Sequence, residues 1–88
     1  MESRVLIKIS KENCEPCKKV ETICSELKEN FEGFRYIELD YDKDDVSKYN
    51  VKRVPLFILM DNERELDRIE SSNPGTIYSW FSKFMMIF

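Results

Sequence analysis

A short run of branched apolar residues near the start of the chain is followed by apolar residues at helical spacing. The segment RVLIKIS (4–10) has the composition of a short, mostly buried strand. From Pro16, which suits a first helical turn, to a stop at Gly33, apolar residues recur at intervals that predict an amphipathic helix. That stripe consists of Val20, Ile23, Cys24, Leu27 and Phe31. A strand that leads into a helix is the first part of a β-α-β unit, which restricts the chain to α/β folds.

The middle of the chain predicts three more strands and one brief helix. FRYIELD (34–40) alternates apolar and polar residues and is predicted to be the second strand. The stretch 41–51 is acidic at its front and suits a brief helix that ends near Asn50. PLFILM (55–60) and RELDRIE (64–70) flank a short polar turn, so they predict a β-hairpin.

A last helix completes the order β-α-β-α-β-β-α. Asn73 can cap this helix and Pro74 can occupy its first turn. Its apolar stripe is Ile77, Trp80, Phe81 and Phe84. A right-handed crossover makes the first two strands parallel, and the hairpin adds antiparallel strands. We therefore predict one α/β domain over residues 1–88, with a four-stranded mixed sheet flanked by helices.

Charge and apolar runs argue against nucleic-acid and membrane partners. The 88 residues carry a net charge of −3, whereas nucleic-acid binding depends on Lys and Arg that neutralise phosphates. The longest apolar runs, LFILM and FMMIF, are far shorter than the ~20 residues that span a bilayer. The N-terminal apolar stretch is too short for a signal-peptide core, so we expect a cytoplasmic protein. The tail MMIF (85–88) offers an apolar patch through which two molecules could pair.

Two cysteines, Cys14 and Cys17, stand at the start of the first predicted helix. Unpaired N–H groups and the helix dipole stabilise an anion there, so Cys14 is predicted to form a nucleophilic thiolate. Cys17, one turn on, can then attack the resulting mixed disulfide and release the partner. A structural zinc site wants four Cys or His ligands, but the chain has three Cys and no His, so we predict no metal site. Cys24 falls on the apolar stripe and is predicted to pack in the core.

Three motifs across nearly the whole chain resemble the thioredoxin superfamily. They are CEPC at 14–17, KYNVKRVPLFIL at 48–59, and the hairpin followed by a C-terminal helix. The resemblance implies that Pro55 is cis and packs beside the disulfide. It also implies that Val54 offers backbone hydrogen bonds to a bound peptide, and that Glu15 and Pro16 help to shape the substrate groove. The fold would be a trimmed thioredoxin fold, because the sequence has no strand and helix before residue 4.

The implied function is that of a thiol–disulfide oxidoreductase, a protein-disulfide reductase that works through a Cys14/Cys17 dithiol–disulfide cycle. It needs no cofactor besides that redox-active disulfide. Its partners would be disulfide-containing client proteins, with ribonucleotide reductase as one candidate, and a thioredoxin reductase-like flavoprotein or glutathione as electron source. The location would be the cytoplasm, or the host cytoplasm if the gene is viral. Two alternatives remain open: a glutathione-dependent glutaredoxin-like protein and a redox-inert interaction module of the same fold.

The sequence departs from the superfamily pattern around the cysteines. Asn13 stands where an aromatic residue usually precedes the first cysteine, and Glu70 or Ser71 replaces the usual glycine before the last helix. Lys8 stands where many thioredoxins bury an acid. It either lies under the cysteine pair and stabilises a thiolate, or reaches water from an edge of the sheet. Glu15 either raises the pKa of Cys14 by charge repulsion or points into solvent, where screening leaves little effect.

Overall fold

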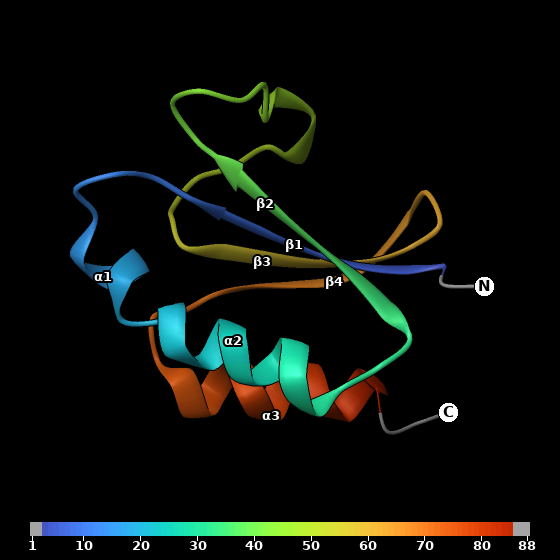
Figure 1. The fold of residues 1–88 in the computed structure, drawn as a ribbon. Coiled ribbons are helices and arrows are strands. Elements are labelled where there is room, and N and C mark those ends of the chain that lie inside the picture. Colours follow the sequence, from blue (N-terminus) through green and yellow to red (C-terminus); the bar gives the residue numbers. More distant parts are fainter. Residues whose placement is uncertain (1–2, 86–88) are drawn as a thin grey trace.

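The computed structural model describes residues 3–85, which form four strands, three α-helices and one 3₁₀ helix (Figure 1). Their bounds are β1 Arg4–Ser10, α1 Glu15–Lys18, α2 Glu21–Asn30, β2 Phe34–Asp40, η1 Ser47–Tyr49, β3 Leu56–Asp61, β4 Arg64–Glu70 and α3 Pro74–Met85. The predicted strands 4–10, 34–40 and 64–70 agree with these bounds, and the third strand begins one residue later than predicted. Asn73 caps α3 through its Oδ1, which accepts a hydrogen bond from the Thr76 N–H at 3.0 Å.

The sheet has the order β2-β1-β3-β4 and mixes parallel with antiparallel pairs, as predicted. β1 pairs with β2 in parallel, and this register places Lys8 opposite Glu38. β1 and β4 each pair with β3 in an antiparallel manner, and the β3–β4 register shifts between Leu59 and Met60. β1 is therefore an interior strand with neighbours on both sides.

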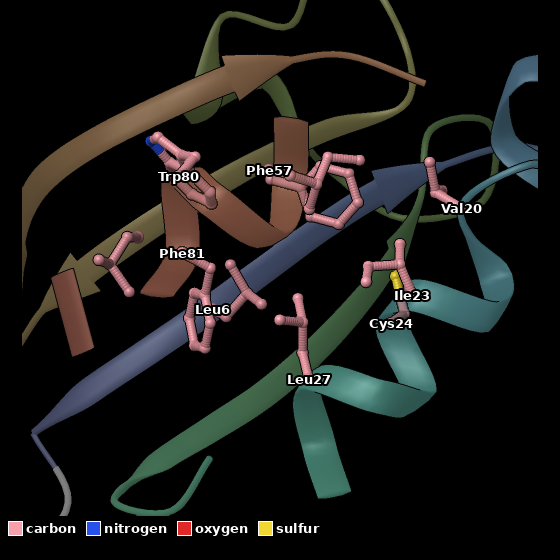
Figure 2. Close-up of a cluster of buried hydrophobic side chains, with 10 residues drawn as sticks. Leu6, Val20, Ile23, Cys24, Leu27, Phe57, Trp80 and Phe81 are labelled. Carbon is pink, nitrogen blue, oxygen red and sulfur yellow. The ribbon is translucent and has the colours of Figure 1, made fainter. Parts of the chain in front are cut away.

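Helices α2 and α3 lie side by side on one face of the sheet (Figure 1). Their apolar stripes meet inward-facing residues of β1 and β3 in the larger core cluster, drawn in Figure 2. Phe81 is fully buried at its centre, with its ring centroid 5.3 Å from that of Phe31 and 4.9 Å from that of Phe34. The cluster also holds Leu6, Val20, Ile23, Cys24, Leu27, Phe57, Leu59, Ile77 and Trp80. Burial of this much apolar surface is the main force that holds the helices on the sheet.

The segment between β2 and β3 covers part of the opposite face (Figure 1). Val46 is buried there against Ile7, Ile9, Leu56 and Ile58. This segment contains only the three-residue η1, so the brief helix predicted over 41–51 is far shorter than expected. It does end near Asn50, as predicted, because Asn50 follows its last residue as the C-cap and adopts the left-handed conformation with φ 52°.

The first predicted helix is interrupted, because α1 and α2 are separate. The Val20 N–H donates to the Cys17 carbonyl at 3.4 Å, a tight turn of the 3₁₀ kind, and Val20 has non-helical ψ near 3°. The turn leaves both Val20 and Cys17 buried, on either side of the interruption. α2 ends at Asn30, and Gly33 (φ 84°) turns the chain into β2 rather than directly stopping the helix.

None of the helices described over residues 3–85 is long and apolar enough to cross a membrane. Most of the MMIF tail, which the sequence marks as a pairing patch, lies outside the described residues.

Candidate active site

Cys14 and Cys17 form a disulfide at the start of α1, with their Cα atoms 5.2 Å apart. Cys14 is the N-cap of α1, as predicted, and its Sγ accepts a hydrogen bond from the Cys17 N–H at 3.2 Å. The exposed fractions are 6% for Cys14 and 5% for Cys17. A backbone N–H that donates to Sγ would also stabilise negative charge on that sulfur in the reduced state.

Residues around the pair shape a tight connection between β1 and α1. Asn13 takes φ 56°, a left-handed conformation that asparagine tolerates better than most residues. This position therefore serves backbone geometry rather than the aromatic packing usual in the superfamily. Pro16 lies in the first turn of α1, where a missing N–H costs nothing.

The Glu15 carboxylate points into solvent. Its side chain is 83% exposed and its Oε1 lies 3.5 Å from the Lys18 Nζ. Exposure and the neighbouring ammonium both weaken any repulsion between Glu15 and Cys14, which favours the second of the two alternatives for this residue. Glu15 is not among the residues that line the adjacent groove.

A groove of about 220 Å³ begins at Pro16 and runs along the loop before β3. The Val54–Pro55 peptide bond in that loop is cis, as the resemblance implied. The groove is lined by Pro16, Arg53, Val54, Pro55, Glu70, Ser71 and Ser72. Four predicted features thus meet at one place: the helix that carries the cysteines, Val54, Pro55 and the glycine-free segment before α3. Arg53 and Glu70 bring opposite charges to the lining of the groove.

Lys8 is buried, with 3% of its surface exposed. The expectation that it reaches water from an edge of the sheet is wrong, because β1 is an interior strand. Its Nζ lies 3.6 Å from Oε2 of Glu38, the residue opposite it on β2. Lys8, Glu38 and Cys17 all line one open cavity of about 430 Å³.

Cys24, on helix α2, is buried in the core, as predicted. Burial raises the pKa of its thiol, and a hydrogen bond with the Tyr36 hydroxyl partly opposes that shift. The Tyr36 hydroxyl donates its one proton to Oε1 of Glu38 at 3.3 Å. Burial raises the pKa of Tyr36 too, so this phenol stays neutral across the physiological range. Cys24, Tyr36, Glu38 and Lys8 therefore form a continuous polar chain between α2 and β1.

Sequence reasoning missed Glu38, Tyr36 and Arg53. A signal for the first two existed, because Tyr36 and Glu38 are two apart in a predicted strand and so share a face. Placing Glu38 opposite Lys8 also required the strand register, which the sequence pattern does not fix. Arg53 directly precedes the predicted Val54–Pro55 pair, but a lone surface arginine carries no specific signal. Over residues 3–85, no cluster of three or more His, Cys, Asp or Glu could hold a metal ion.

Comparison with curated proteins identifies relatives of modest identity. Thioredoxin H5 from Oryza sativa subsp. japonica is 30% identical over 81 residues, which cover 90% of this chain and 60% of that protein. Thioredoxin-2 from Pyricularia oryzae is 27% identical over 71 residues, which cover 78% of this chain and 42% of that protein. The chain thus spans 60% or less of the length of these two relatives.

Solved structures agree in fold over nearly the whole chain. Thioredoxin from Trypanosoma brucei brucei superposes with a TM-score of 0.87 at 22% identity, over 97% of this chain and 77% of that one. Oxidised thioredoxin from Plasmodium falciparum gives 0.87 at 21% identity, over 96% of this chain and 83% of that one. A sequence model described as Thioredoxin matches residues 1–83. With its disulfide at the start of α1 and a cis-proline before β3, the chain belongs to the thioredoxin family.

Proposed function

We propose that this protein is a thiol–disulfide oxidoreductase that reduces disulfides in client proteins. The observation that carries the proposal is the Cys14–Cys17 disulfide at the N-terminus of α1, next to a groove lined by Pro16, Val54 and Pro55. A redox-inert module of the same fold has no use for two cysteines held within bonding distance. The domain assignment to residues 1–88 belongs to the same proposal.

Cys14 is the proposed nucleophile and Cys17 the resolving thiol. In the reduced protein, the Cys14 thiolate attacks one sulfur of a client disulfide, so a Cys14–client bond forms and the client S–S bond breaks. The departing client sulfur takes up a proton. Cys17 then loses its proton and attacks Cys14 Sγ, which forms the Cys14–Cys17 disulfide and releases the second client sulfur as a thiolate that is protonated. Two electrons pass from the cysteine pair to the client.

The groove is the proposed place where the client backbone lies beside the disulfide. Val54 would pair with the client through backbone hydrogen bonds, while Pro55 and Pro16 keep the client close to Cys14. Arg53 and Glu70 on the groove wall would bear on which client side chains fit. Lys8 would modulate the thiols from the cavity that it shares with Cys17.

The electron source is proposed to be a thioredoxin reductase-like flavoprotein, with glutathione as the alternative. The family match supports the flavoprotein, and ribonucleotide reductase is one candidate client. We place the protein in the cytoplasm, or the host cytoplasm for a viral gene, where such a pair is kept reduced and contributes to electron transport and redox homeostasis.

The test is reduction of insulin disulfides by dithiothreitol, with and without the purified protein. We expect acceleration by wild type, no acceleration by Cys14→Ser, and a client held on Cys14 as a stable mixed disulfide in Cys17→Ser. Cys24→Ser is the matched control, because it removes a thiol without touching the pair. Equal rates for wild type and Cys14→Ser would overturn the proposal. Recycling by NADPH with thioredoxin reductase, compared with glutathione and glutathione reductase, separates the two electron sources.

A further inference from the structure

Lys8 is a buried charge beside the redox pair that the disulfide chemistry described above does not itself require. Among the described residues 3–85, Lys8 is the only charged residue that is buried, with 3% of its surface exposed. Burying an ammonium group is unfavourable unless an opposite charge or hydrogen-bond acceptors lie close to it. Its partner is Glu38, whose side chain is 53% exposed, at 3.6 Å. Such a costly arrangement calls for an explanation beyond packing.

The pair faces Cys17 across one cavity. Lys8 and Glu38 are opposite each other in the parallel β1–β2 register, so their side chains leave the sheet on the same face. Helix α2 packs on that face. The cavity next to the pair is lined by Lys8, Glu38 and Cys17 but not by Cys14. A charge in this cavity therefore acts first on the resolving cysteine.

Other charges around the cavity are exposed or only half-buried. The cavity is also lined by Lys11, Glu12, Lys18, Glu21 and Asp40. Glu12 is bound to Lys43, and Lys18 lies near Glu15, both in exposed ion pairs. From β2, Tyr36 donates to Glu38, and from α2, Cys24 contacts Tyr36 while the Lys28 Nζ lies 4.7 Å above the Tyr36 ring. Solvent screens exposed charges, so the buried Lys8 dominates the potential in the cavity.

We propose that Lys8 and Glu38 are an opposed pair of positioning residues for the resolving step, in which Lys8 stabilises the Cys17 thiolate and Glu38 limits that stabilisation. This rests on the proposed function and deepens it. The step begins when Cys17 gives up its proton to cavity water. The new thiolate attacks Cys14 Sγ, which forms the Cys14–Cys17 bond, breaks the Cys14–client bond and releases the client sulfur as a thiolate. Lys8 favours the charged state of Cys17, and Glu38 both holds the ammonium and offsets part of its charge.

The proposal predicts opposite effects of two neutralising substitutions. In Lys8→Met, loss of the ammonium should raise the midpoint of Cys17 thiolate formation by about one pH unit, a tenfold change in the ionisation equilibrium. In Glu38→Gln, loss of the opposing carboxylate should lower that midpoint. Release of client from the Cys14 mixed disulfide should slow in Lys8→Met and quicken in Glu38→Gln at neutral pH.

The experiment is an NMR titration of isotope-labelled cysteine in the reduced protein, which follows Cys14, Cys17 and Cys24 separately. Lys83→Met and Glu65→Gln are matched controls that make the same charge changes on α3 and β4, and neither should move Cys17. The Glu38 side chain is 53% exposed, and the amide oxygen introduced by Glu38→Gln can still accept a hydrogen bond from the Lys8 ammonium. Glu38→Gln is therefore expected to fold, and it keeps the test valid if Lys8→Met does not fold. Opposite shifts of Cys17 support the proposal.

Shifts in the same direction, or no shift beyond the controls, would mean that the pair serves only folding and would overturn the proposal. The outcome is separable from that of the proposed function. If wild-type Cys14 and Cys17 do not cycle between dithiol and disulfide, the proposed function fails. If they cycle normally while Lys8→Met and Glu38→Gln leave Cys17 unmoved, only this inference fails.

Discussion

The Trp80 indole N–H donates to Oδ2 of Asp67 at 3.0 Å, which ties helix α3 to the outer strand β4. Trp80 is 7% exposed and its ring packs against Phe81 and Phe84, with centroids 6.4 Å and 5.9 Å away. The indole thus contributes apolar surface to the core and one polar contact at its rim. This contact holds α3 to the strand that leads into segment 70–72, whose residues line the groove.

Asp67→Ala should lower the free energy of unfolding by about 1–2 kcal/mol, because the buried indole N–H loses its acceptor. Asp67→Asn should cost less, since the amide oxygen can still accept. Urea unfolding followed by tryptophan fluorescence measures both. Glu63→Ala, a charge removal in the nearby β3–β4 turn, is the control, and an equal loss in Glu63→Ala and Asp67→Ala would show that the contact adds nothing.

Phe81→Ala should destabilise the fold by about 3–5 kcal/mol, because it removes a fully buried ring that contacts aromatic neighbours on three sides. Phe81→Leu should cost clearly less, as most of the volume is kept. Thermal and denaturant melts of both variants measure the difference. The half-buried Phe84→Ala is the comparison, and a loss there as large as in Phe81→Ala would contradict the placement of the core centre.

Arg68 binds the Glu65 carboxylate through Nε and NH2 at 2.8 Å and 2.7 Å, and these bonds lower the pKa of Glu65. A lowered folded-state pKa means that the pair contributes stability above the unfolded pKa and loses it as pH falls through the folded value. The Glu65 side chain is 38% exposed, so the contribution is screened to less than about 1 kcal/mol. Glu65→Gln should therefore cost a few tenths of a kcal/mol in denaturation near pH 7, and this cost should shrink as the pH falls through the lowered pKa of Glu65. A cost that persists undiminished in acid would contradict the electrostatic origin.

Asn50 ends η1 with φ 52°, a conformation that asparagine and glycine adopt more readily than other residues. Asn50→Ala should lower stability by about 1 kcal/mol, whereas Asn50→Gly should be close to neutral. Asn30→Ala, at the last helical position of α2, tests the loss of an asparagine side chain without the left-handed backbone. If Asn50→Gly were as costly as Asn50→Ala, the side chain rather than the backbone would be responsible.

Cys24 should resist alkylation in the folded, oxidised protein at neutral pH. Its thiol is buried and its pKa is raised, so the reactive thiolate is scarce as well as covered. Mass spectrometry after iodoacetamide treatment should detect no label in native buffer and one label in urea. Rapid labelling of the native protein would mean that the region around α2 opens readily.

The strands, the last helix and the cysteine pair could be predicted because each depends on local patterns. Alternation of apolar and polar residues predicted β2, and Asn73 and Pro74 predicted the start of α3. The CEPC motif predicted a cysteine pair at the start of a helix, whereas the cis bond before Pro55 was implied only by the resemblance to the superfamily. The interruption between α1 and α2 could not be predicted, because helical spacing continues across Val20 and only tertiary burial selects the tight turn. Burial of Lys8 depends on β1 being interior and on its register with Glu38, which are properties of the assembled sheet.

The shift in register between Leu59 and Met60 and the charge on the outer strands have a consequence for association between molecules. Outer strands present unpaired N–H and C=O groups, and flat apolar ones recruit strands from other chains. Here β2 and β4 carry charged side chains, namely Arg35, Glu38, Asp40, Arg64, Glu65, Asp67, Arg68 and Glu70. Irregular pairing of this kind increases the local twist of a strand, which makes β4 a poorer template for a flat sheet. The charged outer strands and the irregular β3–β4 pairing thereby protect the protein from adding strands of its own kind and growing into fibrils.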